Sequence, residues 1–393
     1  MTLSAKREYL DAIFERYKNA TKKQKSKILD EFCLVCGLTR KHAIRLLRCG
    51  SRSPNRKPGP AAIYDEAFMV HLVKLWELMH KMCGKRMKAA LPIWLPYYEH
   101  ADLTDEIRTK LLQISSSSID RLLKPYRNRK PKGMTSTKPA KDFKKQIPIK
   151  TLDNAVSEPG HFEADTVAHC GNSIEGEFIN TLTMVDLLSG WTENRACWNK
   201  KSEVIVDRVM DIRKTVPMSM KSCSVDNGSE FLNHNVRKYF NGRHPSTVRL
   251  TRTRPYKKND AAHVEQRNDI TVRKLIGYER LDNAVLVPLL NEIYKQYWNP
   301  LFNYFFPTMK MKSKMRIGGR IIKKYDAPKT PCQRLIDSGK LTEAQQRRLQ
   351  SNLETLNPME LTRALELKLK EFHDLVKKSN NPIQILEVLD DAS

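Results

Sequence analysis

The stretch Val-Asp-Asn-Gly-Ser-Glu-Phe at residues 225–231 decides the fold expected of this chain. Residues 221–225 form a short run of polar and apolar side chains, which predicts a strand. Asp226 stands where that strand ends, Gly228 permits a tight turn, and Ser229 can cap the helix that follows. An aspartate on such a turn suits a hard metal ion, although Asp-Asn-Gly is also a common turn sequence without any site.

Two further acids stand in comparable settings upstream and downstream. Residues 160–167 alternate like a strand and place Asp165 in its middle. Residues 256–268 read as a loop that enters a helix, with Glu265 in the early turns of that helix. Three acids in these settings favour a metal site over a simple turn, because hard divalent ions prefer several carboxylate oxygens.

This pattern resembles the acidic triad of the transposase and retroviral-type integrase superfamily, and within it the bacterial insertion-sequence transposases with an integrase core. In that family the second acid stands in an Asp-Asn-Gly-x-Glu-Phe setting, which residues 226–231 match. The third acid follows a loop with proline and aspartate and precedes an asparagine, a pattern matched by Pro255, Asp260, Glu265, Gln266 and Asn268. Asp226 and Glu265 are 39 residues apart, a few more than the commonest family spacing, which suggests a small insertion between them. The resemblance is close over about residues 151–300 and only general elsewhere.

The resemblance implies an α/β RNase-H-like catalytic core, a mixed five-stranded sheet with helices, joined to N-terminal all-α helix-turn-helix domains and a helical C-terminal tail. It also implies that the chain binds the ends of its own element, cleaves DNA strands and joins them to target DNA. Asp165, Asp226 and Glu265 would be the catalytic residues and would hold two divalent ions, which stabilise the attacking and leaving oxygens of phosphodiester transfer. All-carboxylate ligation implies Mg²⁺, with Mn²⁺ able to replace it. A homo-oligomer that holds two DNA ends together follows by analogy.

Two other functions stay open. A non-catalytic DNA-binding regulator descended from such an enzyme would bind DNA without cutting it, although it would have no use for three converging acids. A hydrolytic nuclease with the same core would cut DNA and never join it.

The composition points to a polyanionic partner. Seventy Lys and Arg against 44 Asp and Glu give a formal net charge of +26, which favours double-stranded DNA as the partner. No apolar run approaches the length that crosses a bilayer and no signal peptide is recognisable, so a soluble, cytoplasmic, nucleoid-associated protein is expected. The 8 scattered cysteines suit reduced thiols better than a disulfide framework.

Residues 1–50 predict a helix-turn-helix domain. A helical pattern over 22–35 is broken by Gly37, and Thr39 can cap a second helix through Leu47. That second helix carries Arg40, Lys41 and Arg45, which suit a major groove; a helical hairpin with a solvated basic face is the alternative. A zinc site at Cys33 and Cys36 is a less favoured reading than buried thiols, because both fall within the helical pattern.

Basic linkers flank a second helical region. Residues 51–62 and 128–150 are rich in proline and cationic residues, which predicts extended linkers. Between them, residues 63–127 predict a second helical domain that ends in a helix-turn-helix, with Arg121 on its short basic helix as a DNA contact.

The remaining predictions concern residues 151–300, 301–330 and 331–393. In the catalytic core, further strands are expected at 177–187, 191–198 and 247–251, with Lys257 and Lys258 as DNA contacts in the loop before Glu265. Residues 301–330 predict a small basic β-hairpin on the DNA backbone, and 331–393 predict C-terminal helices that begin at capping boxes.

Overall fold

The five-stranded sheet formed by strands between residues 161 and 252 is mixed in direction. The computed structural model describes residues 1–49, 63–127, 156–226, 228, 230–241, 248–253, 262–317 and 320–379. The strands are β1 (His161–Ala168), β2 (Ile179–Asp186), β3 (Thr192–Trp198), β4 (Ser222–Val225) and β5 (Arg249–Arg252). They lie in the order β3-β2-β1-β4-β5, with β1, β2 and β3 antiparallel, β4 parallel to β1 and β5 parallel to β4. The predicted mixed five-stranded sheet is therefore confirmed, and its order is compatible with an RNase-H-like core.

Helices cover this sheet. Helix α8 (Ser202–Thr215) lies against β3 and against α9 (His234–Asn241). Helix α10 (Ala262–Arg267) lies against β1 and β2, and continues through a π-helical segment, Asn268–Arg273, into α11 (Lys274–Ile276). Short π-helical turns inside α-helices are rare and are frequently found at functional sites.

The turn between β2 and β3 is held by Asp186. This buried carboxylate accepts hydrogen bonds from Gly160 N (2.7 Å), Ser189 N (2.8 Å) and Ser189 Oγ (2.6 Å). Gly190 follows with a φ of 75°, a left-handed conformation that favours glycine. Asp186 therefore has a structural role at this turn.

Three more helical segments lie between the sheet and the C-terminal helices. They are α12 (Leu286–Glu292), the π-helical segment Ile293–Trp298 and α13 (Asn299–Phe305). Helix α12 lies against β3, and α16 (Pro358–Ser379) packs on α12, α13 and the π-helical segment. The buried side chains of α16 include Leu365 and Phe372, so its apolar stripe packs into the core.

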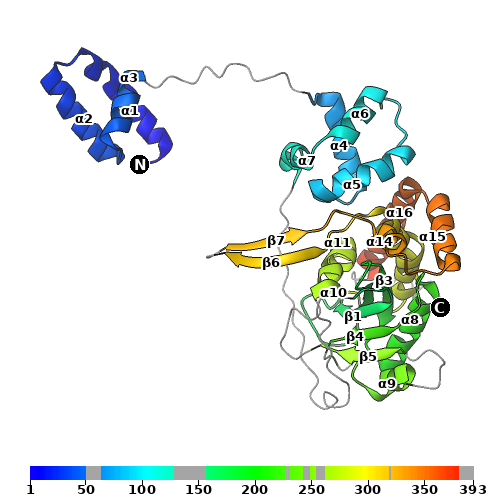
Figure 1. Cartoon of the computed structure of the whole chain (residues 1–393). Coiled ribbons are helices and arrows are strands. Elements are labelled where there is room, and N and C mark those ends of the chain that lie inside the picture. Colours follow the sequence, from blue (N-terminus) through cyan, green and yellow to red (C-terminus); the bar gives the residue numbers. More distant parts are fainter. Residues whose placement is uncertain are drawn as a thin grey trace, which may run out of the picture. The chain divides into compact units, whose positions relative to one another are not determined.

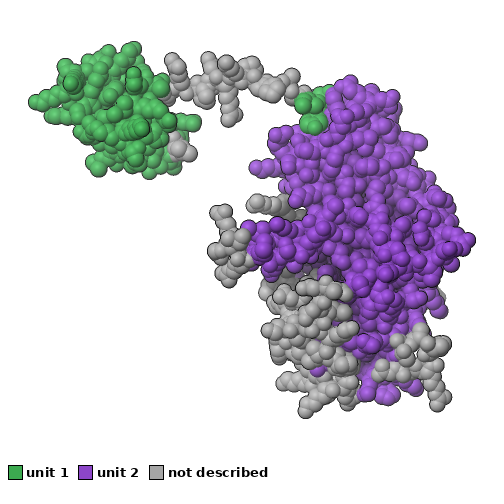
Figure 2. Space-filling model, in the orientation of Figure 1, with its two compact units in different colours: residues 1–65 green, residues 66–393 purple. Residues whose placement is uncertain are grey.

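The chain forms two compact units, Met1–Asp65 and Glu66–Ser393, coloured green and purple in Figure 2. Helices α4 (Glu66–Leu78), α5 (Gly84–Trp94), α6 (Asp105–Gln113) and α7 (Ser116–Leu122) belong to the second unit. Trp94 Nε1 donates to Phe305 O at 2.9 Å, and Arg86 Nε donates to Pro307 O at 2.5 Å. These bonds attach α5 to the end of α13.

The first unit is a small helical body. It contains α1 (Leu3–Asn19), α2 (Lys22–Cys36) and α3 (Arg40–Cys49), labelled in Figure 1. Gly37 adopts a left-handed conformation, with a φ of 62°, and ends α2 as the sequence predicts. Cys36 is buried in the core of this unit and Cys33 packs against it.

The last part of the second unit begins with a β-hairpin. Its strands, β6 (Met311–Ile317) and β7 (Arg320–Tyr325), are antiparallel, which confirms the predicted hairpin. Helices α14 (Pro331–Asp337), α15 (Glu343–Thr355) and α16 follow. The predicted capping box at Thr342 is present: its hydroxyl accepts from Gln345 N, and the Gln345 side chain accepts from Thr342 N. None of the helices in the described residues is long and apolar enough to cross a membrane.

Candidate functional site

Asp165 and Asp226 lie at neighbouring positions of two adjacent parallel strands. The last paired residues of β1 and β4 are Ala164 and Val225, and each is followed directly by one of the two acids. Because parallel strands carry equivalent positions side by side, the two carboxylates meet at the end of β4. The structure therefore brings together two of the three predicted catalytic acids.

Asp165 is oriented by two hydrogen bonds. Its Oδ1 accepts from Thr166 N at 2.8 Å, and its Oδ2 accepts from the side-chain amide of Asn268 at 2.8 Å. Burial of the carboxyl, followed by the negative charge of Asp226, raises the pKa of Asp165 to about 7. Without a cation, this group is therefore half protonated near neutral pH.

Asp226 is held by the turn that follows it. Its Oδ1 accepts from Gly228 N at 2.8 Å. A Cβ at Gly228 would collide with Glu230 Oε2 and would lie 2.9 Å from Asp226 Oδ1, so a larger residue here would force these two carboxylates to move. Burial, and then the charge of Glu230, raises the pKa of Asp226.

Glu230 is a third acid at this site. The predicted helix from Ser229 begins only at His234, so Glu230 lies in the preceding turn rather than in a helical first turn. Its Oε1 accepts from Thr166 Oγ1 at 2.8 Å and from Lys200 Nζ at 3.0 Å. Burial opposes ionisation of Glu230, but the Lys200 charge and these hydrogen bonds outweigh it, and its pKa is lowered.

Lys200 reaches Glu230 from the turn after β3. Asn199 there adopts a left-handed conformation, with a φ of 60°, which asparagine tolerates better than most residues. Its side-chain oxygen accepts from Lys201 N at 3.0 Å, which fixes the turn. Sequence reasoning missed Lys200 because nothing in its local pattern points to an acid 30 residues away in the chain.

Glu265 lies on α10 with its side chain exposed. The helix is attached to β1 at two points, since Val264 N donates to Glu163 Oε2 at 3.1 Å and Asn268 donates to Asp165. Glu265 stands one turn before Asn268, so the two residues share a helix face. No hydrogen bond or ion pair joins Glu265 to the residues that the structure describes. Among these residues, Glu265 does not form a group with Asp165 and Asp226 that could hold a metal ion.

The donor atoms at the end of β4 suit a hard cation in part. Asp165 and Asp226 supply carboxylate oxygens whose mutual charge is unfavourable without a proton or a cation. Beside them, the side-chain oxygen of Asn268 is buried and accepts no hydrogen bond from the described residues. Carboxylate and amide oxygens are ligands of Mg²⁺. Within the described ranges, however, no three His, Cys, Asp or Glu side chains form a group that could hold a metal ion.

The predicted DNA contacts lie on exposed surfaces where the structure describes them. On α3, Lys41 and Arg45 are exposed, whereas the exposed Arg40 forms an ion pair with Asp30. On α7, Arg121 is exposed. The predicted contacts Lys257 and Lys258 fall outside the described residues.

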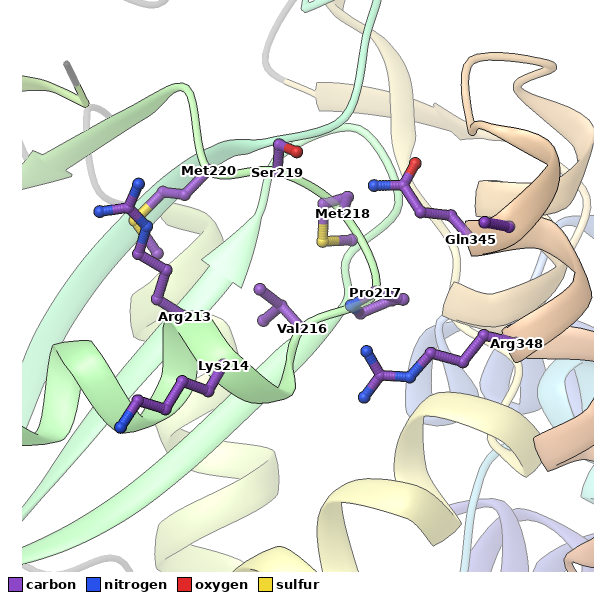
Figure 3. Close-up of a pocket in the computed structure, with 10 residues that line it drawn as sticks. Arg213, Lys214, Val216, Pro217, Met218, Ser219, Met220, Gln345 and Arg348 are labelled. Carbon is purple, nitrogen blue, oxygen red and sulfur yellow. The ribbon is translucent and has the colours of Figure 1, made fainter. Parts of the chain in front are cut away.

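A cavity of about 450 Å³ lies elsewhere in the second unit (Figure 3). It is bounded by the end of α8, by the segment that leads to β4 and by α15, through Arg213, Lys214, Val216, Pro217, Met218, Ser219, Met220, Ala344, Gln345 and Arg348. None of the predicted site residues lines it. The cavity is therefore not part of the acid site.

Comparison with known proteins gives a sequence relative and distant structural likenesses. No protein-family model matches the chain. A solved structure, the simian T-cell lymphotropic virus intasome in complex with PP2A regulatory subunit B56 gamma, matches 42% of this chain and 54% of its own at 15% identity, with a TM-score of 0.28. A likeness of that size carries no conclusion about fold or function.

The sequence relative is far closer. It is an uncharacterized protein of Sinorhizobium fredii, y4rM, which is 35% identical over 344 residues. The match covers 85% of this chain and 96% of the Sinorhizobium protein, so most of this chain corresponds to nearly the whole of that protein. On that identity and coverage, the chain belongs to the same family as y4rM of Sinorhizobium fredii.

Proposed function

We propose that this chain is a DNA transposase with an RNase-H-like integrase core, which cleaves DNA strands at the ends of its element and joins them to target DNA. The observation that carries the proposal is the meeting of Asp165 and Asp226 at the ends of adjacent parallel strands. The family resemblance assigns the catalytic acids to these two positions and to Glu265. A net charge of +26 supports a nucleic-acid substrate.

The described residues have definable roles in such a reaction. Asp165 and Asp226 would hold Mg²⁺, or Mn²⁺ in its place, and Glu265 would complete the ligand set. When bound, the metal supplies Lewis-acid stabilisation of the attacking and leaving oxygens. Thr166 N and the Asn268 amide keep the Asp165 carboxylate in one orientation, and Gly228 N does the same for Asp226. Pre-orientation of ligands in this way reduces the rearrangement needed when the reacting phosphate binds.

The Glu230–Lys200 pair would keep charge at the site in balance. Lys200 neutralises Glu230 without contacting Asp165 or Asp226 through any hydrogen bond among the described residues. Glu230 in turn accepts from the Thr166 hydroxyl, while the Thr166 amide donates to Asp165. The pair therefore acts as a support for the Asp165 carboxylate rather than as a further metal ligand.

The position of Glu265 is also compatible with one alternative. Its side chain is exposed and stands apart from the other two acids, an arrangement that a non-catalytic DNA-binding regulator would also tolerate. A hydrolytic nuclease with the same core remains the other candidate. These functions differ in the DNA products that they leave.

The test is an assay on DNA with purified full-length protein. A plasmid that carries the gene with its flanking DNA is incubated with MgCl₂ and scored for nicks at the element ends and for joined products. The proposal expects both, and expects Asp226→Asn to abolish both while duplex binding persists. The control Asp207→Asn removes an exposed acid of α8 and should leave both products unchanged. Nicks without joining would establish a nuclease, and binding without nicks would establish a regulator.

A further inference from the structure

The β6–β7 hairpin projects from the second unit as a ribbon without a core of its own (Figure 1). All its described side chains are exposed except that of Ser313, which is half-buried. A two-stranded hairpin in water is at best marginally stable, because it buries too little apolar surface. Such a hairpin needs either stabilising contacts at its base or a partner along its length.

The base of the hairpin is held by hydrogen bonds to the rest of the second unit. Backbone hydrogen bonds run both ways between Thr308 and Lys329, at 2.8 and 3.1 Å. Asp326 accepts from Lys310 N at 2.6 Å and from Arg334 of α14 at 2.5 Å. The Lys310 ammonium donates to the carbonyls that follow β2, Leu187 O at 2.6 Å and Leu188 O at 2.8 Å. The hairpin is thus fixed to the sheet that carries the acid pair.

The arm itself is strongly cationic. Residues 311–325 contain six Lys and Arg and no acid. Lys314 stands directly opposite Lys323 in the strand register, and like charges in that position destabilise a hairpin. None of its four lysines, which are Lys312, Lys314, Lys323 and Lys324, forms an ion pair with a described residue. The free protein therefore carries a repulsion that a polyanion would remove.

The neighbouring register pair is apolar. Met315 stands opposite Ile322, and these side chains are 46% and 42% exposed. Successive residues of a strand point to opposite faces, so this pair lies on the face opposite to Lys314 and Lys323. The ribbon thus has a lysine pair on one face and an exposed apolar pair on the other.

We propose that the β6–β7 hairpin is a duplex-DNA-binding arm. Met315 and Ile322 face the floor of the groove, and the long side chains of Lys314 and Lys323, on the outer face of the ribbon, extend sideways to the phosphates at the rim of the groove. The width of the major groove admits a two-stranded ribbon, and apolar side chains there can contact base edges. This inference rests on the proposed function for its DNA substrate, and it assigns to this segment a share of DNA binding that is independent of the acid site.

The experiment measures the affinity of full-length protein for a fluorescent duplex of arbitrary sequence by anisotropy, over a range of salt concentrations. The test variant is the double substitution Lys314→Gln, Lys323→Gln. Its matched control, Lys340→Gln with Lys370→Gln, removes the same charge from two exposed lysines outside the hairpin. Two lost phosphate contacts should lower the salt slope by about 1.8 and weaken binding about 30-fold at 0.15 M salt. The control should retain the wild-type slope.

The outcomes separate this inference from the proposed function. If wild type binds DNA and the test variant matches the control in affinity and slope, the arm does not bind DNA and the inference is wrong. If instead the test variant changes only the mass measured by light scattering, the arm pairs protein copies and the inference is equally wrong. A second variant, Met315→Ser with Ile322→Ser, should weaken binding without altering the salt slope; no loss would exclude the groove contact. Strand joining by wild type is scored separately, so its absence bears on the proposed function alone.

Discussion

Replacing Asp165 by asparagine should stabilise the metal-free protein, and more strongly at high pH. The pKa of Asp165 is raised from 3.8 to about 7 in the folded chain, chiefly by burial and next by Asp226. A raised carboxyl pKa means that the folded state holds the proton more tightly than the unfolded state. The stabilisation that the Asp165 carboxyl contributes is therefore fully present at low pH and is lost as the pH rises from about 4 to about 7.

The magnitude follows from that window. Within this window, each pH unit lowers the free energy of unfolding of the wild type by about 1.4 kcal/mol. About two of the units between pH 5 and pH 8 lie inside the window. The difference in unfolding free energy between Asp165→Asn and wild type should thus grow by about 3 kcal/mol from pH 5 to pH 8. Any fixed cost of altering the bond to Asn268 is the same at both values and cancels.

The assay is urea unfolding in chelator-treated buffer at both pH values, with Asp207→Asn as the control for losing an exposed acid. Added MgCl₂ at pH 8 should then stabilise wild type and leave Asp165→Asn unchanged, because a ligand stabilises only the folded state that binds it. An equal difference at pH 5 and pH 8 would refute the reasoning about burial and charge at Asp165.

Three further outcomes follow from the described contacts. Gly228→Ala should lower the free energy of unfolding by about 1–3 kcal/mol, because the new methyl collides with a buried carboxylate; an unchanged denaturation midpoint would contradict the close approach seen at this turn. Trp94→Phe should cost about 1–3 kcal/mol in the same measurement, because it leaves a buried carbonyl unpaired, and no loss would mean that α5 does not depend on α13. Lys41→Gln with Arg45→Gln should lower the salt slope of duplex binding by about 1.8 if α3 contacts phosphates, and an unaltered slope would remove α3 from the DNA surface.

The local pattern of the sequence is enough to predict the strands and most of the helices. Alternation around Asp165 predicted β1, and the Gly37 break predicted the turn between α2 and α3. The capping box at Thr342 marked the start of α15. Each of these signals is carried by neighbouring residues, so it can be read without knowing the tertiary contacts.

The features that could not be predicted from the sequence depend on contacts between residues far apart in the chain. Ser229 was expected to cap a helix, but α9 begins only at His234, and Glu230 in the preceding turn is paired with Lys200. The attachment of α5 to α13 through Trp94 has no sequence signal, because any apolar helix could have received that indole. The site itself was predictable in part: the pairing of Asp165 with Asp226 follows from strand order, whereas the exposure of Glu265 depends on how α10 is set against β1.

The most direct measurement of the central claim is the number of Mn²⁺ ions bound by full-length protein with duplex DNA, counted by electron paramagnetic resonance. If Asp165, Asp226 and Glu265 together hold two divalent ions, wild type should bind two, and Asp226→Asn should bind neither tightly. Glu265→Gln should lose one of them. Equal stoichiometry and affinity in wild type and Glu265→Gln would contradict the account.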